Sequence, residues 1–278
     1  KELETFVGHP SEAMRIAAVV SLRRLKCFKE LTSFINDASP QVMSDAVRAV
    51  YDEADAQTFS EHPKSLYAVA GSLDPQHPPA VNVRAIAANR RLGTFASAKR
   101  ISRFLASPSL SRALRIQALY ALESWPQASQ LDPIDGRYFP VSAGDMDALN
   151  AAIGPEIWAL ANDTEAKISR QAIAVLQRIN PDKAKLNQAA DFVLDEKQRN
   201  VLRKEWLRLL RKWDLTLFTS VGVQVLSSKS TALRMVAAQE LTEAELGGSA
   251  VDNYLLATLK NSTDTVELQQ AIKMIPKL

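Results

Sequence analysis

Residues 114–122, LRIQALYAL, carry the clearest copy of a pattern that recurs along the chain. It places Arg115, Ala118 and Leu122 at offsets zero, plus three and plus seven, which lie on one face of an α-helix. Two other stretches follow the same rule: MRIAAVVSL at 14–22 and LRMVAAQEL at 233–241. A small residue at plus three lets a neighbouring helix approach closely. The chain therefore contains an internal repeat built on a helix.

Eight copies of this pattern occur along the chain, with position zero at residues 15, 43, 84, 115, 169, 203, 234 and 268. All but one of the gaps between copies measure 28 to 41 residues, close to the length of a helix–turn–helix unit. A second apolar segment precedes most copies, and Pro, Ser, Asp or Asn residues that begin helices separate the two. We therefore predict an all-α protein, an α–α superhelix of about eight helix pairs with no sheet of consequence.

Composition and spacing narrow the class of repeat. The chain has 278 residues, of which 46% are hydrophobic but only 6% aromatic, a balance that suits helices packed through small residues and disfavours a β-sandwich. The loose period and the Arg-x-x-Ala-x-x-x-Leu core resemble HEAT repeats, and the signatures of tetratricopeptide and ankyrin repeats are missing. We expect one HEAT-type solenoid over 1–278, cut from a longer protein. A helical bundle without repeats is the alternative, but it gives no reason for the clustered spacing.

Charge and reactive residues point away from catalysis. The net charge is +3, a weaker bias than dedicated nucleic-acid binders show. The single cysteine, Cys27, excludes an internal disulfide, and His9, His62 and His77 lack the spacing of metal ligands. No apolar run approaches the ~20 residues that span a bilayer. We predict no catalytic residue, no cofactor and no metal in this chain, and no membrane span.

One gap between copies is too long, at 54 residues. It contains WPQASQLDPIDGRYFPVSAGDMD, residues 125–147, which has no helical periodicity but carries several apolar side chains. We interpret it as an ordered loop insertion that docks through Trp125, Tyr138 and Phe139, with turn hydrogen bonds around Asp132 and Gly136. Because it interrupts a regular array, it is the best candidate for contact with a neighbouring domain.

The same loop carries a family resemblance. Trp125 and Pro126, followed by Asp132, Gly136, Arg137, Tyr138 and Pro140, resemble the helical-repeat portion of large secreted proteins of planctomycetes and verrucomicrobia. The similarity covers roughly residues 80–210. In that family the repeats lie between an N-terminal β-propeller, similar to sugar dehydrogenases, and a C-terminal cytochrome c domain. The resemblance implies a periplasmic or secreted protein, although the propeller pattern and a Cys-x-x-Cys-His motif are absent from this chain.

A second candidate surface is the basic stretch KQRNVLRKEWLRLLRKWD, residues 197–214. On a helical wheel, Lys204, Arg208, Arg211 and Lys212 lie on the side opposite the apolar residues. Such a stripe could meet phosphate or an acidic partner, as in the alkylpurine DNA glycosylases built from similar repeats. A solvated outer face is the simpler interpretation, and we favour it.

Two functions therefore remain open. The first is a non-catalytic interaction or scaffold module with a protein partner, which spaces a dehydrogenase-like propeller from a cytochrome c domain if the resemblance holds. The second is a nucleic-acid-binding repeat protein that uses the basic stretch. We favour the first, because the tryptophans fall at apolar helix positions. Its candidate contact residues are Trp125, Asp132, Gly136, Arg137, Tyr138 and Phe139.

Overall fold

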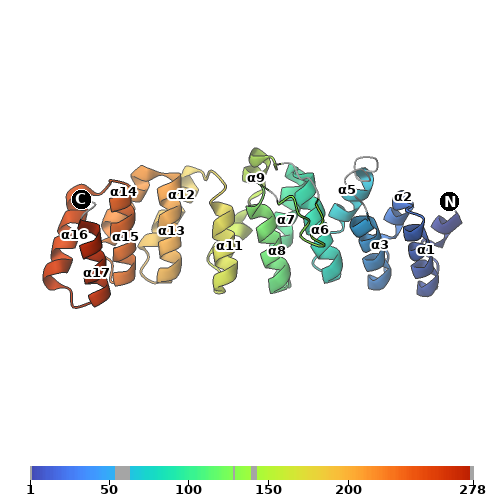
Figure 1. Cartoon of the computed structure of the whole chain (residues 1–278), viewed down its shortest axis with the longest axis horizontal. Coiled ribbons are helices and arrows are strands. Elements are labelled where there is room, and N and C mark those ends of the chain that lie inside the picture. The colour runs from blue at the N-terminus through green and yellow to red at the C-terminus, as the bar shows by residue number, and fades with distance from the viewer. Residues whose placement is uncertain (1, 54–62, 128, 139–142, 276–278) are drawn as a thin grey trace. The chain divides into compact units, whose positions relative to one another are not determined.

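The computed structural model describes residues 2–53, 63–127, 129–138 and 143–275. Helices account for 71% of the chain (Figure 1). Over the described ranges, the only strand-like feature is a single antiparallel bridge between Leu131 and Tyr138. The chain is therefore all-α, as the sequence pattern predicts, and no helix in these ranges is long and apolar enough to cross a membrane.

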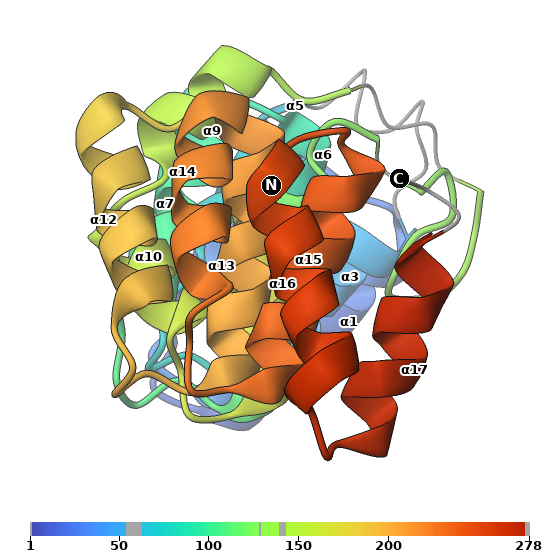
Figure 2. The same ribbon diagram turned by 90° about the vertical axis from the view of Figure 1, so that its left-hand side faces the viewer.

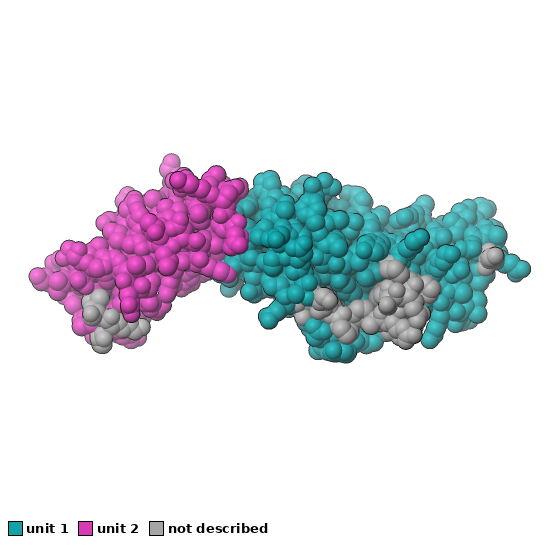
Figure 3. Space-filling view, turned by 90° about the horizontal axis from the view of Figure 1, so that it is seen from above, with its two compact units in different colours: residues 1–179 teal, residues 180–278 magenta. Residues whose placement is uncertain are grey.

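The helices form two compact units, residues 1–179 and 180–278 (Figure 3). Among the described residues, the first unit holds five helix pairs: η1 (Glu2–Phe6) with α1 (Glu12–Arg24), α2 (Phe28–Leu31) and η2 (Thr32–Phe34) with α3 (Pro40–Glu53), α5 (Pro63–Gly71) with α6 (Pro79–Leu92), α7 (Phe95–Leu105) with α8 (Arg112–Glu123), and α9 (Met146–Ala152) and α10 (Pro155–Ala161) with α11 (Ala166–Leu176). The second unit holds three: α12 (Lys183–Leu194) with α13 (Asn200–Trp213), α14 (Leu215–Val225) with α15 (Thr231–Glu243), and α16 (Gly248–Asn261) with α17 (Thr265–Met274). Each predicted copy of the repeat falls on the second helix of a pair.

The turns between helices behave as the sequence predicts. The side chains of Ser111 and Ser230 accept hydrogen bonds from backbone N–H groups in the first turns of α8 and α15. Asp182 and Asp264 do the same for α12 and α17. These bonds satisfy N–H groups that have no partner inside the helix. Polar capping residues therefore set where the helices begin.

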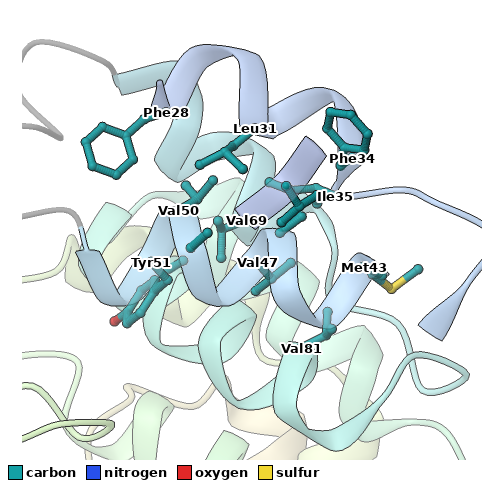
Figure 4. Close-up of a cluster of buried hydrophobic side chains, with 14 of the residues drawn as sticks. Phe28, Leu31, Phe34, Ile35, Met43, Val47, Val50, Tyr51, Val69 and Val81 are labelled. Atoms are coloured by element: carbon teal, nitrogen blue, oxygen red, sulfur yellow. The ribbon is translucent and has the colours of Figure 1, made fainter. Parts of the chain in front are cut away.

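Small residues at plus three bring the helices together. The alanines predicted to lie at helix contacts are all buried, with at most 5% of their surface exposed: Ala18, Ala87, Ala118, Ala172 and Ala237. In the first unit, Leu31 and Phe34 pack against Val47 and Val50 of α3, with Val69 of α5 completing the cluster (Figure 4). The core is thus shared between successive pairs, and no pair buries its apolar face alone.

In the copies at Arg15 and Arg234, the arginine at position zero joins one repeat to the next. Arg15 donates to the carboxylate of Asp37, just before α3, and to the carbonyl of His9 in its own turn. Arg234 repeats this arrangement with Glu267 at the start of α17, at 2.7 Å, and with the carbonyl of Ser228. Each arginine therefore ties its own turn to the acidic residue that opens the next second helix.

Glu267 shows the electrostatic effect of this arrangement. Burial of its carboxyl group opposes ionisation, but hydrogen bonds from Ser262, Arg234 and Tyr254 outweigh that effect. The pKa of Glu267 consequently lies below its usual value. The carboxylate is ionised and fully engaged within the second unit at neutral pH.

Candidate interaction site

The loop begins at a fully buried tryptophan. Trp125 has no exposed surface, and its Nε1–H donates to the carbonyl of Asp145 at 3.0 Å. The N–H of Gly144 donates to the carbonyl of Trp125 at 2.8 Å, so the two ends of the loop are tied together. Gly144 faces the indole ring so closely that a Cβ atom there would overlap it. The predicted packing of Trp125 is confirmed. Because the side chain is fully buried, it cannot contact a partner directly.

Arg90 of α6 lies beneath this junction. One terminal nitrogen donates to the carbonyls of Ser124 and Trp125, each at 2.9 Å, and the guanidinium carbon lies 5.2 Å from the centre of the Trp125 ring. Burial lowers the pKa of Arg90 to about 10, so the group stays charged at neutral pH. Carbonyl dipoles and the face of the indole, rather than a carboxylate, stabilise this buried cation.

Asp132 forms a second anchor in the middle of the loop. Only 2% of its side chain is exposed. Its Oδ2 accepts a hydrogen bond from the Tyr51 hydroxyl of α3 at 2.9 Å and pairs with Arg91 of α6. Its Oδ1 accepts from the backbone N–H of Ile134 at 2.8 Å. One carboxylate therefore holds the loop to two second helices and shapes the turn that follows it.

Tyr51 is suited to donate in this cluster. Burial raises the pKa of its hydroxyl well above the usual value, although the nearby Arg91 acts in the opposite direction. The Arg91 guanidinium carbon also lies 4.5 Å from the centre of the Tyr51 ring. Tyr51 is consequently a neutral donor across the physiological pH range, and the charge balance of the cluster rests on Arg91 and Asp132.

A tight turn follows at residues 132–137. Gly136 has a φ of 72°, a conformation that side chains other than glycine resist, and its N–H donates to the Asp132 carbonyl at 2.9 Å. Arg137 pairs with Asp135 and donates to the carbonyl of Asp52 on α3. The turn predicted around Asp132 and Gly136 is present, and Arg137 adds a third attachment to the helices.

Tyr138 does not dock, which corrects the sequence prediction. It is 70% exposed, and its bridge partner Leu131 is 56% exposed. Paired residues on antiparallel strands point to the same face, and successive residues point to opposite faces. Because Asp132 points inward, Leu131 and Tyr138 point outward. Phe139, the third predicted docking residue, lies outside the described residues.

The outward side of the loop borders an apolar pocket that sequence reasoning missed. It has a volume of about 70 Å³ and lies between α6 and α8, with loop residues along one edge. Its apolar lining comprises Val83, Ile86, Ala87, Tyr120, Ala121, Leu131 and Pro133. Tyr120 on α8 is 54% exposed at this site. The sequence held one indication of this pocket, which is that Tyr120 lies on a helix shortly before the loop insertion.

The basic stretch has a different environment from the one expected. Arg208 of α13 donates to Glu240 of α15 at 3.0 Å and to Glu205 at 2.9 Å. Arg211 pairs with Glu240 and, at 3.4 Å, with Glu243. Burial alone lowers the pKa of Arg208, but its carboxylate partners outweigh that effect and raise it. These arginines join α13 to α15, while Lys204 is half-buried and Lys212 is exposed.

Several solved structures resemble the chain at low sequence identity. No protein-family model matches the chain, and no curated protein does. A designed armadillo repeat protein is 14% identical, with a TM-score of 0.39 over 90% of this chain and 99% of that one. Another, in complex with the peptide (KR)4, is 12% identical, with a TM-score of 0.40 over 90% of this chain and 98% of that one. Human deoxyhypusine hydroxylase is 14% identical, with a TM-score of 0.34 over 99% of this chain and 94% of that one.

The helix pairs themselves carry the fold assignment. Their alternating order, their buried alanines and their arginine–acid links between successive pairs are those of a helical-repeat array. The chain therefore has an all-α helical-repeat fold of the HEAT/armadillo-like type.

Proposed function

We propose that this chain is a non-catalytic protein-interaction module and that it binds its partner through the surface around the apolar pocket. We call this surface the loop face and define it as the pocket together with Tyr120, Leu131, Arg137 and Tyr138. The observation that carries the proposal is the exposure of three large apolar side chains around an apolar pocket: Tyr120 on α8, and Leu131 and Tyr138 on a segment that the buried carboxylate of Asp132 holds in place.

The composition of the loop face favours a protein partner. Tyrosine and arginine are enriched at the centres of protein interfaces, where aromatic side chains contribute large contact areas. Tyr120 and Tyr138 expose more than half of their surface, and the Arg137 side chain is 51% exposed. Asp132 already holds residues 131–137 against the helices in the free chain, so binding does not have to order this segment. The part of Asp132 in the interaction is to present the loop face.

The resemblance of the loop to the propeller–repeat–cytochrome proteins suggests where the partner lies. We propose that residues 1–278 form one continuous repeat array within a longer polypeptide that is periplasmic or secreted. The array then spaces a dehydrogenase-like propeller from a cytochrome c domain, and the loop face contacts one of these neighbours. The pairing of Arg208 and Arg211 with Glu240 disfavours the nucleic-acid alternative, because these guanidinium groups already have carboxylate partners.

Site-specific cross-linking in the complete natural polypeptide tests this proposal. A photoactivatable phenylalanine analogue replaces Tyr138, and in a matched control it replaces Lys229, whose side chain is 91% exposed in the other unit. We expect the variant at position 138 to cross-link to a neighbouring domain, and Leu131→Asp to reduce that yield. Equal yields from the two positions, or a yield that Leu131→Asp leaves unchanged, overturn the loop face as the contact surface.

A further inference from the structure

The two sides of each second helix face different neighbours. Consecutive second helices within each unit contact one another, from α1 with α3 to α15 with α17. The residues at plus four and plus seven of the earlier helix are buried, with at most 2% exposed, in five of the helices that have a successor in their unit: Val19 and Leu22, Val47 and Val50, Leu119 and Leu122, Leu207 and Leu210, and Ala238 and Leu241. In α6 the corresponding residues are Ala88, which is buried, and Arg91, which pairs with Asp132 of the loop.

The first helix of the array shows which side faces which way. In α1, which has no second helix before it among the described residues, Met14 just before position zero is 42% exposed. The corresponding residues of most later helices are buried; Val42, Leu114 and Leu233, for example, are at most 6% exposed. The residue before position zero therefore faces the preceding repeat, and plus four and plus seven face the following one.

At α17 the side that faces a following repeat is uncovered. Ala271 and Met274, on the side towards α15 and α16, are at most 5% exposed. Ile272 at plus four and Ile275 at plus seven are 57% and 46% exposed. On α16, Leu256 and Leu259 lie three residues apart and are 54% and 36% exposed. Figure 2 looks onto these two helices.

A terminal repeat of a soluble array normally carries a polar outer face. Ile272 and Ile275 instead occupy the plus-four and plus-seven positions, through which earlier second helices contact their successors within each unit. Leu256 and Leu259 add to this uncovered face from the first helix of the same pair. We propose that a further helix pair of the same type covers this face, and that the polypeptide following Leu278 supplies it. The proposal shares with the proposed function only the premise that the polypeptide continues beyond Leu278.

The chemistry of the junction follows from the residues present. Position zero of α17 is Leu268 rather than arginine, so α17 cannot make the forward link to an acidic residue that Arg15 and Arg234 make. The following second helix therefore needs apolar residues before position zero and at plus three to meet Ile272 and Ile275. It does not need an acidic residue at its start. Leu256 and Leu259 lie where the first helix of the new pair packs.

A comparison of two lengths of the protein tests the inference. Ile272→Glu is made in the 278-residue chain and in the complete natural polypeptide, and Gln269→Glu on the exposed side of the same helix is the matched control. In the 278-residue chain, we expect both variants to leave the urea midpoint unchanged. In the complete polypeptide, we expect only Ile272→Glu to lower the midpoint, and α17 amides to exchange at least about tenfold more slowly than in the shorter chain.

Three outcomes overturn the proposal. The first is that the two variants change the urea midpoint of the complete polypeptide equally, and the second is that the α17 amides exchange at the same rate in both lengths of the protein. The third is that the 278-residue chain forms a dimer that Ile272→Glu dissociates, because a second copy would then cover the face. Cross-linking from Tyr138 is independent of all three, so failure here and failure of the loop face are separately visible.

Discussion

Replacement of Asp132 by alanine should detach the loop from the array. The side chain is almost fully buried and accepts from the Tyr51 hydroxyl, from Arg91 and from two backbone N–H groups of the following turn. The alanine variant leaves the Tyr51 hydroxyl buried without this acceptor and removes the carboxylate that compensates Arg91. Breaking a buried ion pair by removing one partner costs about 3–5 kcal/mol, a large fraction of the ~5–15 kcal/mol that stabilises a typical domain.

Urea unfolding measures the loss of global stability, and hydrogen exchange measures the loosening of the loop. We expect Asp132→Ala to lower the free energy of unfolding by about 3–5 kcal/mol and to accelerate exchange across residues 129–138. Asp135→Ala is the matched control, because Asp135 lies three residues away and pairs with Arg137 at the surface. An exposed pair of that kind contributes only about 0–1 kcal/mol.

Two results would refute this reasoning. If Asp132→Ala costs no more than the control, the carboxylate does not anchor the loop. If it costs several kcal/mol but leaves exchange at 129–138 unchanged, Asp132 stabilises the contact between α3 and α6 and the loop is held by other groups. The pairing of Asp132 with Tyr51 can be isolated by a double-mutant cycle with Tyr51→Phe.

Four further predictions follow from individual contacts. Ala118→Leu should overpack the fully buried contact of α8 and cost about 1–3 kcal/mol, so an unchanged melting temperature would place that residue outside the core. Gly144→Ala should cost a similar amount through overlap with the buried indole, whereas Gly71→Ala, with nothing within 4 Å of the added carbon, should not destabilise the chain. Folding lowers the pKa of Glu267, so the ionised carboxylate contributes to the free energy of unfolding at neutral pH. As the pH falls below about 4.5, the unfolded state binds the proton before the folded state does, and this contribution is lost as the pH approaches the folded pKa. Glu267→Gln should remove that dependence in acid titrations followed by circular dichroism. DNA should bind the native chain no more tightly than ~100 μM at physiological salt. Glu240→Gln, which removes the carboxylate that the two arginines of α13 share, should tighten salt-sensitive binding; micromolar binding by the native chain would revive the nucleic-acid alternative.

The repeat was predictable because its evidence is local. Ala118 and Leu122 lie within one helix, so their spacing alone shows which face is buried. The same reasoning applied to the other copies places every second helix correctly. The start of each helix was also predictable, because a capping side chain such as Ser111 acts within three residues of itself.

The attachments of the loop were not predictable, because they depend on residues far away in sequence. Asp132 and Gly136 were recognisable as turn residues from their own neighbours. Their partners Tyr51 and Arg91, however, lie 81 and 41 residues before Asp132. Without the inward direction of Asp132, nothing in the sequence assigns Tyr138 to the outer face, and its aromatic character suggested the opposite.

The same limit applies to the basic helix, where it changes the functional interpretation. Arg208 and Arg211 have few acidic residues near them in sequence, but Glu240 and Glu243 reach them from the next second helix. In a repeat array, residues about one period apart become neighbours, so a charge stripe must be weighed against the following copy of the repeat and not only against its own helix. In Arg208, Arg211 and Arg234, the positive charge serves to join repeats. The loop face and α17, by contrast, expose apolar side chains. We therefore place recognition at those two surfaces rather than at the arginines.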